Sequence, residues 1–114
     1  MHELGIAEEL LRAILPQAER HGAKRITRVS LRVGVLRAVV ADNLSFLFAH
    51  VARGTIAEGA LLAIEEERLC VVCPSCGKRS EAQAIVLECP ACGAEGIGLS
   101  GGDDLQIVDF DIDD

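Results

Sequence analysis

The stretch LCVVCPSCGK, residues 69–78, holds three cysteines at even three-residue steps. The pentapeptide CPSCG (73–77) within it recurs almost unchanged as CPACG (89–93). In each pentapeptide the proline sets the start of a turn, and the glycine permits a positive φ. Backbone N–H groups can then point at the cysteine sulfurs. We therefore interpret both pentapeptides as metal-binding knuckles.

Two knuckles of this kind predict a closed tetrahedral metal site of the zinc-ribbon type. Twelve residues separate the second cysteine of one knuckle from the first of the next, enough for a short hairpin. Four sulfur ligands leave no position for water, so the zinc is expected to be structural. Iron in a rubredoxin-like site also fits four thiolates, but the scarcity of aromatic residues favours zinc. The expected zinc ligands are Cys73, Cys76, Cys89 and Cys92.

Cys70 is the cysteine left over, because it lacks the proline and glycine of a knuckle. We expect it to be a buried or half-buried thiol. The other readings are a spare metal ligand, which would shift the ligand set by one turn, and a redox partner of Cys73. A redox pair needs a thiolate at a helix start, and no such setting is evident in the sequence.

The composition indicates one soluble domain with a modest core. The chain has 114 residues, of which 50% are hydrophobic and 25% charged, and no apolar run approaches the roughly 18 residues that span a bilayer. Its first residues carry Glu3, Glu8 and Glu9, where a signal peptide would carry positive charge. We expect a cytoplasmic protein with no membrane association, in which cysteines bind metal and do not form disulfides.

Charge is distributed unevenly along the chain. The formal net charge is −7, and a tetrathiolate zinc site would add about two negative charges. This balance disfavours nucleic-acid binding, which depends on Lys and Arg meeting phosphates. Seven of the eleven basic residues lie between Arg12 and Arg37, whereas residues 103–114 include six aspartates. Such a separation suits protein partners.

Apolar periodicity predicts two helices. The first spans residues 3–21 and ends at Gly22, although Pro16 should kink or split it. The second is capped by Asp42 and ends before Gly54. The first helix is expected to present Leu4, Ala7, Leu11, Ile14 and Ala18, and the second Leu44, Leu47, Phe48 and Val51.

Three strands and a linker account for most of the remaining chain. Residues 26–33 alternate and predict a half-buried strand, and residues 61–69 predict a strand that runs into the cysteine segment. Residues 93–102 are glycine-rich and are read as a linker. The closing strand, 105–112, is expected to turn Val108, Phe110 and Ile112 inward.

The fold class that follows is α+β. Two helices are expected to pack on a small mixed three-stranded sheet, with a zinc-ribbon lobe inserted before the last strand. Residues 1–69 together with 103–114 would form the α/β lobe, and residues 70–102 the ribbon lobe and its linker.

The N-terminal residues MHE form a second group of candidate metal ligands. The imidazole and backbone nitrogen of His2, the amine of Met1 and the amide of Glu3 can form a nitrogen-rich square. Ni(II) and Cu(II) prefer that geometry, and Zn(II) does not seek it. Because amides bind only after losing a proton, affinity should fall in acid. Taken alone the signal is weak, since a histidine at a chain terminus is usually an ordinary exposed residue.

Several motifs together make the chain resemble the HypA/HybF family, the nickel metallochaperones of [NiFe]-hydrogenase maturation. They are MHE before an amphipathic helix, HGAKRI, LRVGVL, GTIAEGALLAIEEE and the paired CPxCG knuckles. The resemblance implies that His2 is the essential nickel ligand, with the Met1 amine, the backbone nitrogens of His2 and Glu3, and the Glu3 carboxylate as companions. It also implies structural zinc in the four-cysteine site.

The same resemblance implies particular partners. They are a GTPase of the HypB kind and the large subunit of hydrogenase, with urease as another recipient of nickel. A monomer or a weak homodimer is expected, and the α/β lobe becomes the nickel-binding lobe.

Two other function classes can be weighed against this reading. A zinc-ribbon module that binds nucleic acid, or a transcription accessory module, should carry bases and aromatics. Residues 70–98 contain only Lys78 and Arg79 as bases and no aromatic. An enzyme is also not expected, because the sequence shows no nucleophile–base pair, no phosphate-binding glycine loop and no open metal position.

Overall fold

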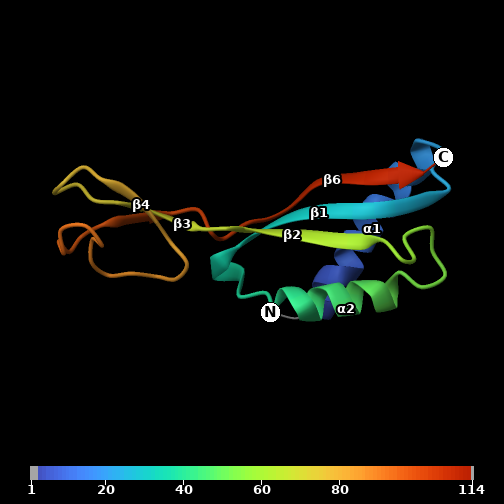
Figure 1. The fold of residues 1–114 in the computed structure, drawn as a ribbon, viewed down its shortest axis with the longest axis horizontal. Helices are drawn as coiled ribbons and strands as arrows, with labels where there is room; N and C mark the ends of the chain where they lie inside the picture. Colours follow the sequence, from blue (N-terminus) through green and yellow to red (C-terminus); the bar gives the residue numbers. More distant parts are fainter. Residues whose placement is uncertain (1–2, 114) are drawn as a thin grey trace. The chain divides into compact units, whose positions relative to one another are not determined.

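The computed structural model describes residues 3–113 and confirms the α+β fold class. The chain divides into two compact units. The helical unit comprises Met1–Arg32, Val39–Glu65 and Gln106–Asp114, and the cysteine unit comprises Val33–Ala38 and Glu66–Leu105. In chain order the elements are α1 (Glu3–Arg20), β1 (Arg25–Gly34), the 3₁₀ helix η1 (Val35–Arg37), α2 (Ala41–Val51), β2 (Leu61–Glu67), β3 (Leu69–Val72), β4 (Arg79–Ala82), β5 (Gly98–Ser100) and β6 (Leu105–Asp113) (Figure 1).

Helix α1 confirms the first predicted helix but corrects two of its details. It runs through Pro16 without being split, so that half of the prediction is wrong, whereas the kink stays a prediction. A proline inside a helix removes only one backbone hydrogen bond, and packing elsewhere can hold the helix together. Its stripe is also rotated from the expected one, since Leu10 is buried and Leu4 is 44% exposed. The helix ends at Arg20, just before the expected stop at Gly22, which has a φ of +71°. The side chains of α1 that lie in the core are Ala7, Leu10, Ile14 and Ala18.

A Schellman motif terminates α1. The N–H of Ala23 donates to the carbonyl of Ala18 at 3.1 Å, and the N–H of Gly22 donates to Glu19 at 3.0 Å. These two bonds satisfy carbonyls that the helix end would otherwise leave unpaired. The chain is then directed into β1.

The sheet of the helical unit has the order β2-β1-β6 (Figure 1). The N–H of Lys24 donates to Asp113 at the start of β1, and the N–H of Gly34 donates to Asp104 at its end, so β6 runs antiparallel to β1. In Figure 1, β2 runs in the same direction as β1, so the sheet is mixed, as predicted. On β1, the expected alternation places Val29, Leu31 and Val33 in the interior.

Helix α2 packs against α1, and one of its predicted features is wrong. Its N-cap is Val40, with no side-chain cap, and Asp42 lies inside the first turn. A carboxylate in the first turn is still favoured by the positive end of the helix dipole. Leu44 and Phe48 are buried and Val51 is half-buried, as the predicted stripe requires.

Strand β6 confirms the closing strand, but its inward set differs from the expected one. Phe110 and Ile112 are half-buried, whereas Val108 is 49% exposed and Ile107 takes the inner position. The alternation therefore shifts by one residue between Ile107 and Phe110. Sequence alternation alone could not reveal this shift, because both candidate residues are β-branched and apolar.

The cysteine unit contains a second three-stranded sheet, with the order β4-β3-β5. Strand β4 pairs antiparallel with β3, opposing Val72 to Arg79, and β5 pairs antiparallel on the other side, opposing Val71 to Leu99. The reading of residues 93–102 as a plain linker is therefore wrong over Gly98–Ser100. The glycine-rich segment gave no strand signal, because the pairing of β5 depends on β3, which is distant in sequence.

Candidate metal centre

The two knuckles are built from the same backbone hydrogen bonds. The N–H of Gly77 donates to the carbonyl of Cys73, and the N–H of Gly93 donates to that of Cys89, both at 2.8 Å. Both glycines have positive φ, +71° and +77°, as the knuckle requires. The first cysteine of each knuckle also donates its N–H forward, to Lys78 at 3.1 Å and to Ala94 at 2.9 Å, respectively. The repeated pentapeptide therefore forms one repeated turn.

The hairpin of β3 and β4 presents the first knuckle. Strand β3 ends at Val72 and β4 begins at Arg79, so residues 73–78 form the connection between two paired strands. The predicted hairpin is therefore centred on the first knuckle and does not lie between the knuckles. The second knuckle precedes β5 and is a turn outside the sheet.

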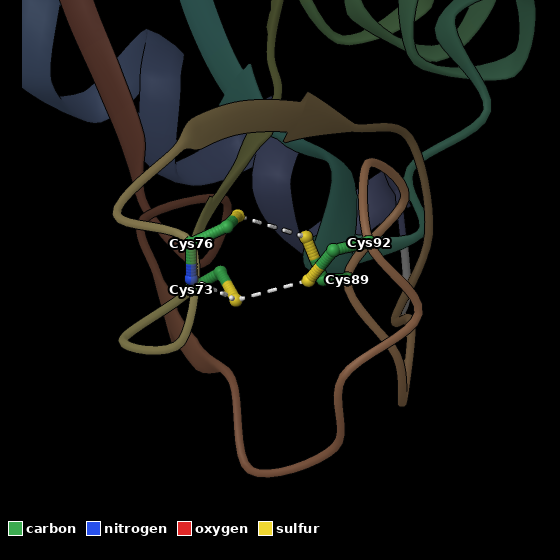
Figure 2. A group of neighbouring side chains, drawn as sticks. All are labelled: Cys73, Cys76, Cys89 and Cys92. Atoms are coloured by element: carbon green, nitrogen blue, oxygen red, sulfur yellow. Dashed lines mark hydrogen bonds between the residues drawn. The ribbon is translucent and has the colours of Figure 1, made fainter.

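The structure brings the four predicted zinc ligands together (Figure 2). The sulfurs of Cys73 and Cys92 lie 3.7 Å apart, and those of Cys76 and Cys89 lie 3.8 Å apart. All four sulfurs lie within 4.8 Å of one another. A tetrahedral zinc with Zn–S bonds of about 2.3 Å places its sulfurs about 3.8 Å apart. The cluster therefore fits structural zinc, with all four positions supplied by sulfur.

The two positions of each knuckle differ in burial. Cys73 and Cys89 are buried, whereas Cys76 and Cys92 are exposed. The sulfur of Cys73 accepts the N–H of Cys76 at 3.5 Å, and the sulfur of Cys89 accepts the N–H of Ala91 at 3.4 Å. The sequence predicted the four cysteines as ligands but did not distinguish the two positions of each knuckle.

Backbone N–H donors favour the thiolate form of the first cysteine in each knuckle. The amides of Cys92 and Ala91 lower the pKa of Cys89 to about 6. The amide of Cys76 likewise lowers the pKa of Cys73. At Cys92 the amide of Ala94 lowers the pKa, but the neighbouring sulfurs of Cys89 and Cys73 outweigh it and raise that pKa to about 12. A divalent cation removes this conflict, because it stabilises all four thiolates together.

Cys70 lies outside the cluster, on β3. It is half-buried, as predicted, and its sulfur accepts a hydrogen bond from Nη2 of Arg79 at 3.5 Å. Among residues 3–113 the only group of three or more metal-ligating side chains is the four-cysteine cluster. The ligand set therefore shows no shift toward Cys70.

The predicted nickel ligands lie at the other end of the sequence. Met1 and His2 are outside the described residues. Glu3, the remaining member, is half-buried and is the first residue of α1.

Residues 1–112 match the family model described as HypA, hydrogenase/urease nickel incorporation metallochaperone. The chain belongs to this family. Hydrogenase maturation factor HypA of Chlorobium limicola is 40% identical over 100% of this chain and 98% of its own length. Its Escherichia coli K12 counterpart is 36% identical over 99% of this chain and 98% of its own. The resemblance inferred from MHE, GTIAEGA and the knuckles is thereby confirmed.

Two solved structures share the HypA fold. The solution structure of the nickel metallochaperone HypA from Helicobacter pylori aligns with a TM-score of 0.64 and 19% identity, covering 98% of this chain and 97% of that one. A second HypA solution structure aligns with a TM-score of 0.68 over 98% and 96% of the two chains, again at 19% identity. These likenesses support the fold.

HypA membership makes this chain part of a family of nickel metallochaperones and hydrogenase maturation factors. The nucleic-acid and transcription readings are not favoured by these matches. Neither helix within residues 3–113 combines the length and apolarity needed to cross a membrane.

Proposed function

We propose that this chain binds Ni(II) at its N-terminus and delivers it during the maturation of [NiFe]-hydrogenase or urease. The imidazole and backbone nitrogen of His2, the amine of Met1 and the amide of Glu3 are the proposed ligands, with the Glu3 carboxylate as a companion. The family match, which begins at residue 1, is the observation that carries this proposal.

The start of α1 supports such a chelate on physical grounds. The helix begins at Glu3, and the first N–H groups of a helix have no acceptor within it. Ligation through the deprotonated Glu3 amide therefore costs α1 no internal hydrogen bond. The positive end of the helix dipole also favours the negative charge of a deprotonated amide.

Two lobes, whose bounds are those expected from the sequence, have different tasks in this proposal. Residues 1–69 with 103–114 would be the nickel-binding lobe, and residues 70–102 the structural zinc lobe. A shallow nickel site at the terminus can release its ion to a recipient, whereas four thiolates hold zinc as part of the fold. No step in this scheme requires catalysis, so we infer a carrier and not an enzyme.

The proposed setting is the cytoplasm, with the chain acting as a monomer or a weak homodimer. A GTPase of the HypB kind and the hydrogenase large subunit are the partners that we propose. The support for them is the role of the family in hydrogenase maturation.

Calorimetric nickel titration of the untagged, zinc-containing protein tests the terminal chelate. His2→Ala and a version with one extra residue before Met1 should each lose most of the nickel affinity, because each removes a ligand or its geometry. His50→Ala is the matched control, since His50 is exposed on α2, and it should bind nickel like the wild type. Equal binding by all four proteins would refute the terminal site.

Acidification provides a second test of the same chelate. Imidazole, amine and amide must all be deprotonated to bind, so nickel affinity should fall as the pH falls. A nickel affinity that stayed constant between pH 8 and pH 6 would contradict the proposed ligands.

A further inference from the structure

A pocket of about 370 Å³ lies in the helical unit, where β1 begins. The loop after α2 reaches that end of the sheet (Figure 1), and the N–H of Ile26 donates to the carbonyl of Ile56 at 2.8 Å. The pocket is of ligand-binding size and includes none of the residues assigned to nickel or zinc. Its lining residues are Lys24, Arg25, Gly54, Thr55, Ile56 and Glu58.

Local hydrogen bonds hold the loop side of the pocket in place. The hydroxyl of Thr55 donates to the carbonyl of Ala52 at 2.6 Å and accepts the N–H of Ala57 at 3.1 Å. The N–H of Glu58 donates to the carbonyl of Thr55 at 3.1 Å. A wall fixed in this way needs little rearrangement to accept a ligand.

Arg25 differs from the other arginines of β1. Arg28 forms an ion pair with Asp111 at 3.1 Å, and Arg32 forms one with Glu65 at 3.7 Å. Arg25 instead donates Nη2 to the carbonyl oxygen of Glu58 at 3.2 Å. That bond positions the guanidinium and leaves its charge without a carboxylate partner among residues 3–113.

The backbone at Gly59 lies beside this guanidinium. A Cβ added at Gly59 would lie 3.4 Å from Nη2 of Arg25, and the residue has a φ of +80°. Gly54 has a similar φ of +77°, but a Cβ there meets nothing within 4 Å. The two glycines have similar backbone strain, but only Gly59 lies against Arg25, whereas Gly54 lines the pocket.

We propose that this pocket binds a single carboxylate from an acidic side chain of a partner protein. Lys24 and Arg25 oppose one carboxylate, Glu58, so the lining carries one net positive charge in a protein of net charge −7. A monovalent carboxylate matches that charge, and guanidinium groups bind carboxylates with good geometry. Phosphate, with about −1.5 to −2 charges near neutral pH, exceeds that net charge, and Glu58 repels it more strongly than it repels a monovalent carboxylate. Ile56 offers apolar surface to the methylenes of the ligand.

Amide chemical shifts of the full-length, zinc-containing protein test this proposal with small probes. N-acetylglutamate amide should shift residues 24–26 and 54–59 with a Kd of roughly 1–10 mM, as befits so small a ligand. N-acetylglutamine amide, the neutral isostere, should leave these residues unshifted. N-acetylalanine, which carries an α-carboxylate, and inorganic phosphate should bind at least about fivefold more weakly.

Variants then locate the site. Arg25→Gln and Lys24→Gln should each weaken N-acetylglutamate amide binding about five- to tenfold, and Glu58→Gln should admit phosphate. Amide shifts outside the loop report whether each variant remains folded.

Several results would overturn the proposal. They are equal shifts with the glutamine amide, tighter binding of phosphate or of the α-carboxylate by the wild type, or unchanged affinity in both Arg25→Gln and Lys24→Gln. Nickel titration of the same variants should match the wild type, so failure of the carboxylate site leaves the proposed nickel function untouched.

Discussion

The two units are stabilised by different means. In the helical unit, side chains such as Ile14, Phe48 and Leu31 form an apolar core that draws on both helices and the sheet. In the cysteine unit the buried side chains are fewer, and two of them, Cys73 and Cys89, belong to the four-cysteine cluster. Ile85 and Leu87 of the cysteine unit remain 62% and 80% exposed.

The difference shows how a short segment can fold without a core of its own. Burial in the cysteine unit is too small to offset the conformational entropy of ordering some forty residues. Binding of structural zinc supplies the missing free energy, about 10–16 kcal/mol in small zinc-binding peptides at neutral pH. The helical unit has no such requirement, because its free energy of folding comes from apolar burial.

Loss of one zinc ligand should have the largest effect. Cys73→Ser removes a buried thiolate, so we expect loss of bound zinc and collapse of amide dispersion in the cysteine unit, with the helical unit still folded. Zinc content and an amide correlation spectrum measure both outcomes. Cys70→Ser, which leaves the cluster intact, should keep its zinc. Unfolding of both units together in Cys73→Ser would show that the two are not independently stabilised.

Acid should reversibly release zinc from the cysteine unit and so distinguish it from the helical unit. Zinc ligation requires thiolates, so protons compete with zinc and its retention should fall as the pH falls. Cys89, whose pKa is lowered to about 6, should be among the last ligands to take up a proton. We expect zinc release between about pH 6 and pH 4, followed with a colorimetric chelator. If zinc were fully retained at pH 4, the tetrathiolate assignment would be contradicted.

A cavity in the apolar core should affect only the helical unit. Phe48 is 1% exposed, so Phe48→Ala should lower the free energy of unfolding by about 3–5 kcal/mol. Phe46, on the same helix, is 74% exposed, and its replacement by alanine should change stability by less than about 0.5 kcal/mol. Urea denaturation with zinc analysis tests the pair, and zinc content should stay constant. Similar losses from both variants would show that α2 is not seated as described.

The smallest expected effect is a gain in stability. Pro16 is exposed inside α1 and provides no backbone N–H, so Pro16→Ala should raise the free energy of unfolding of the helical unit by about 1–3 kcal/mol. Ala13→Gly, an exposed substitution in the same helix, should lower it by about 1 kcal/mol. Thermal denaturation measures both changes. No gain from Pro16→Ala would mean that the helix is already relaxed around the proline.

Predictability from the sequence differed with the range of the interactions involved. The knuckles, the alternation of β1 and the stop at Gly22 were all evident, because each depends on residues a few positions apart. Three expectations were wrong: a split at Pro16 (the alternative, a kink, stays a prediction), the cap at Asp42 and the inward position of Val108. In each case a plausible local preference was overridden by packing in the folded chain.

The nickel site and the zinc site also differed in how far the sequence could predict them. The four-cysteine cluster could be predicted because two copies of one pentapeptide have few ways to satisfy four thiols. The nickel assignment to Met1, His2 and Glu3 stays a prediction, supported by the family and by the start of α1 at Glu3.

By itself, the amino-acid sequence determined the family, the order of the helices and strands in the helical unit, and the four cysteines that form the cluster. These features depend on short motifs and on the spacing of apolar residues along the chain. Only the tertiary structure decided that Gly98–Ser100 joins a second sheet, which cysteine of each knuckle is buried, and that Lys24 and Arg25 line a pocket with Glu58. Such pairings join residues far apart in the chain, and their energies exist only once the intervening segments have folded.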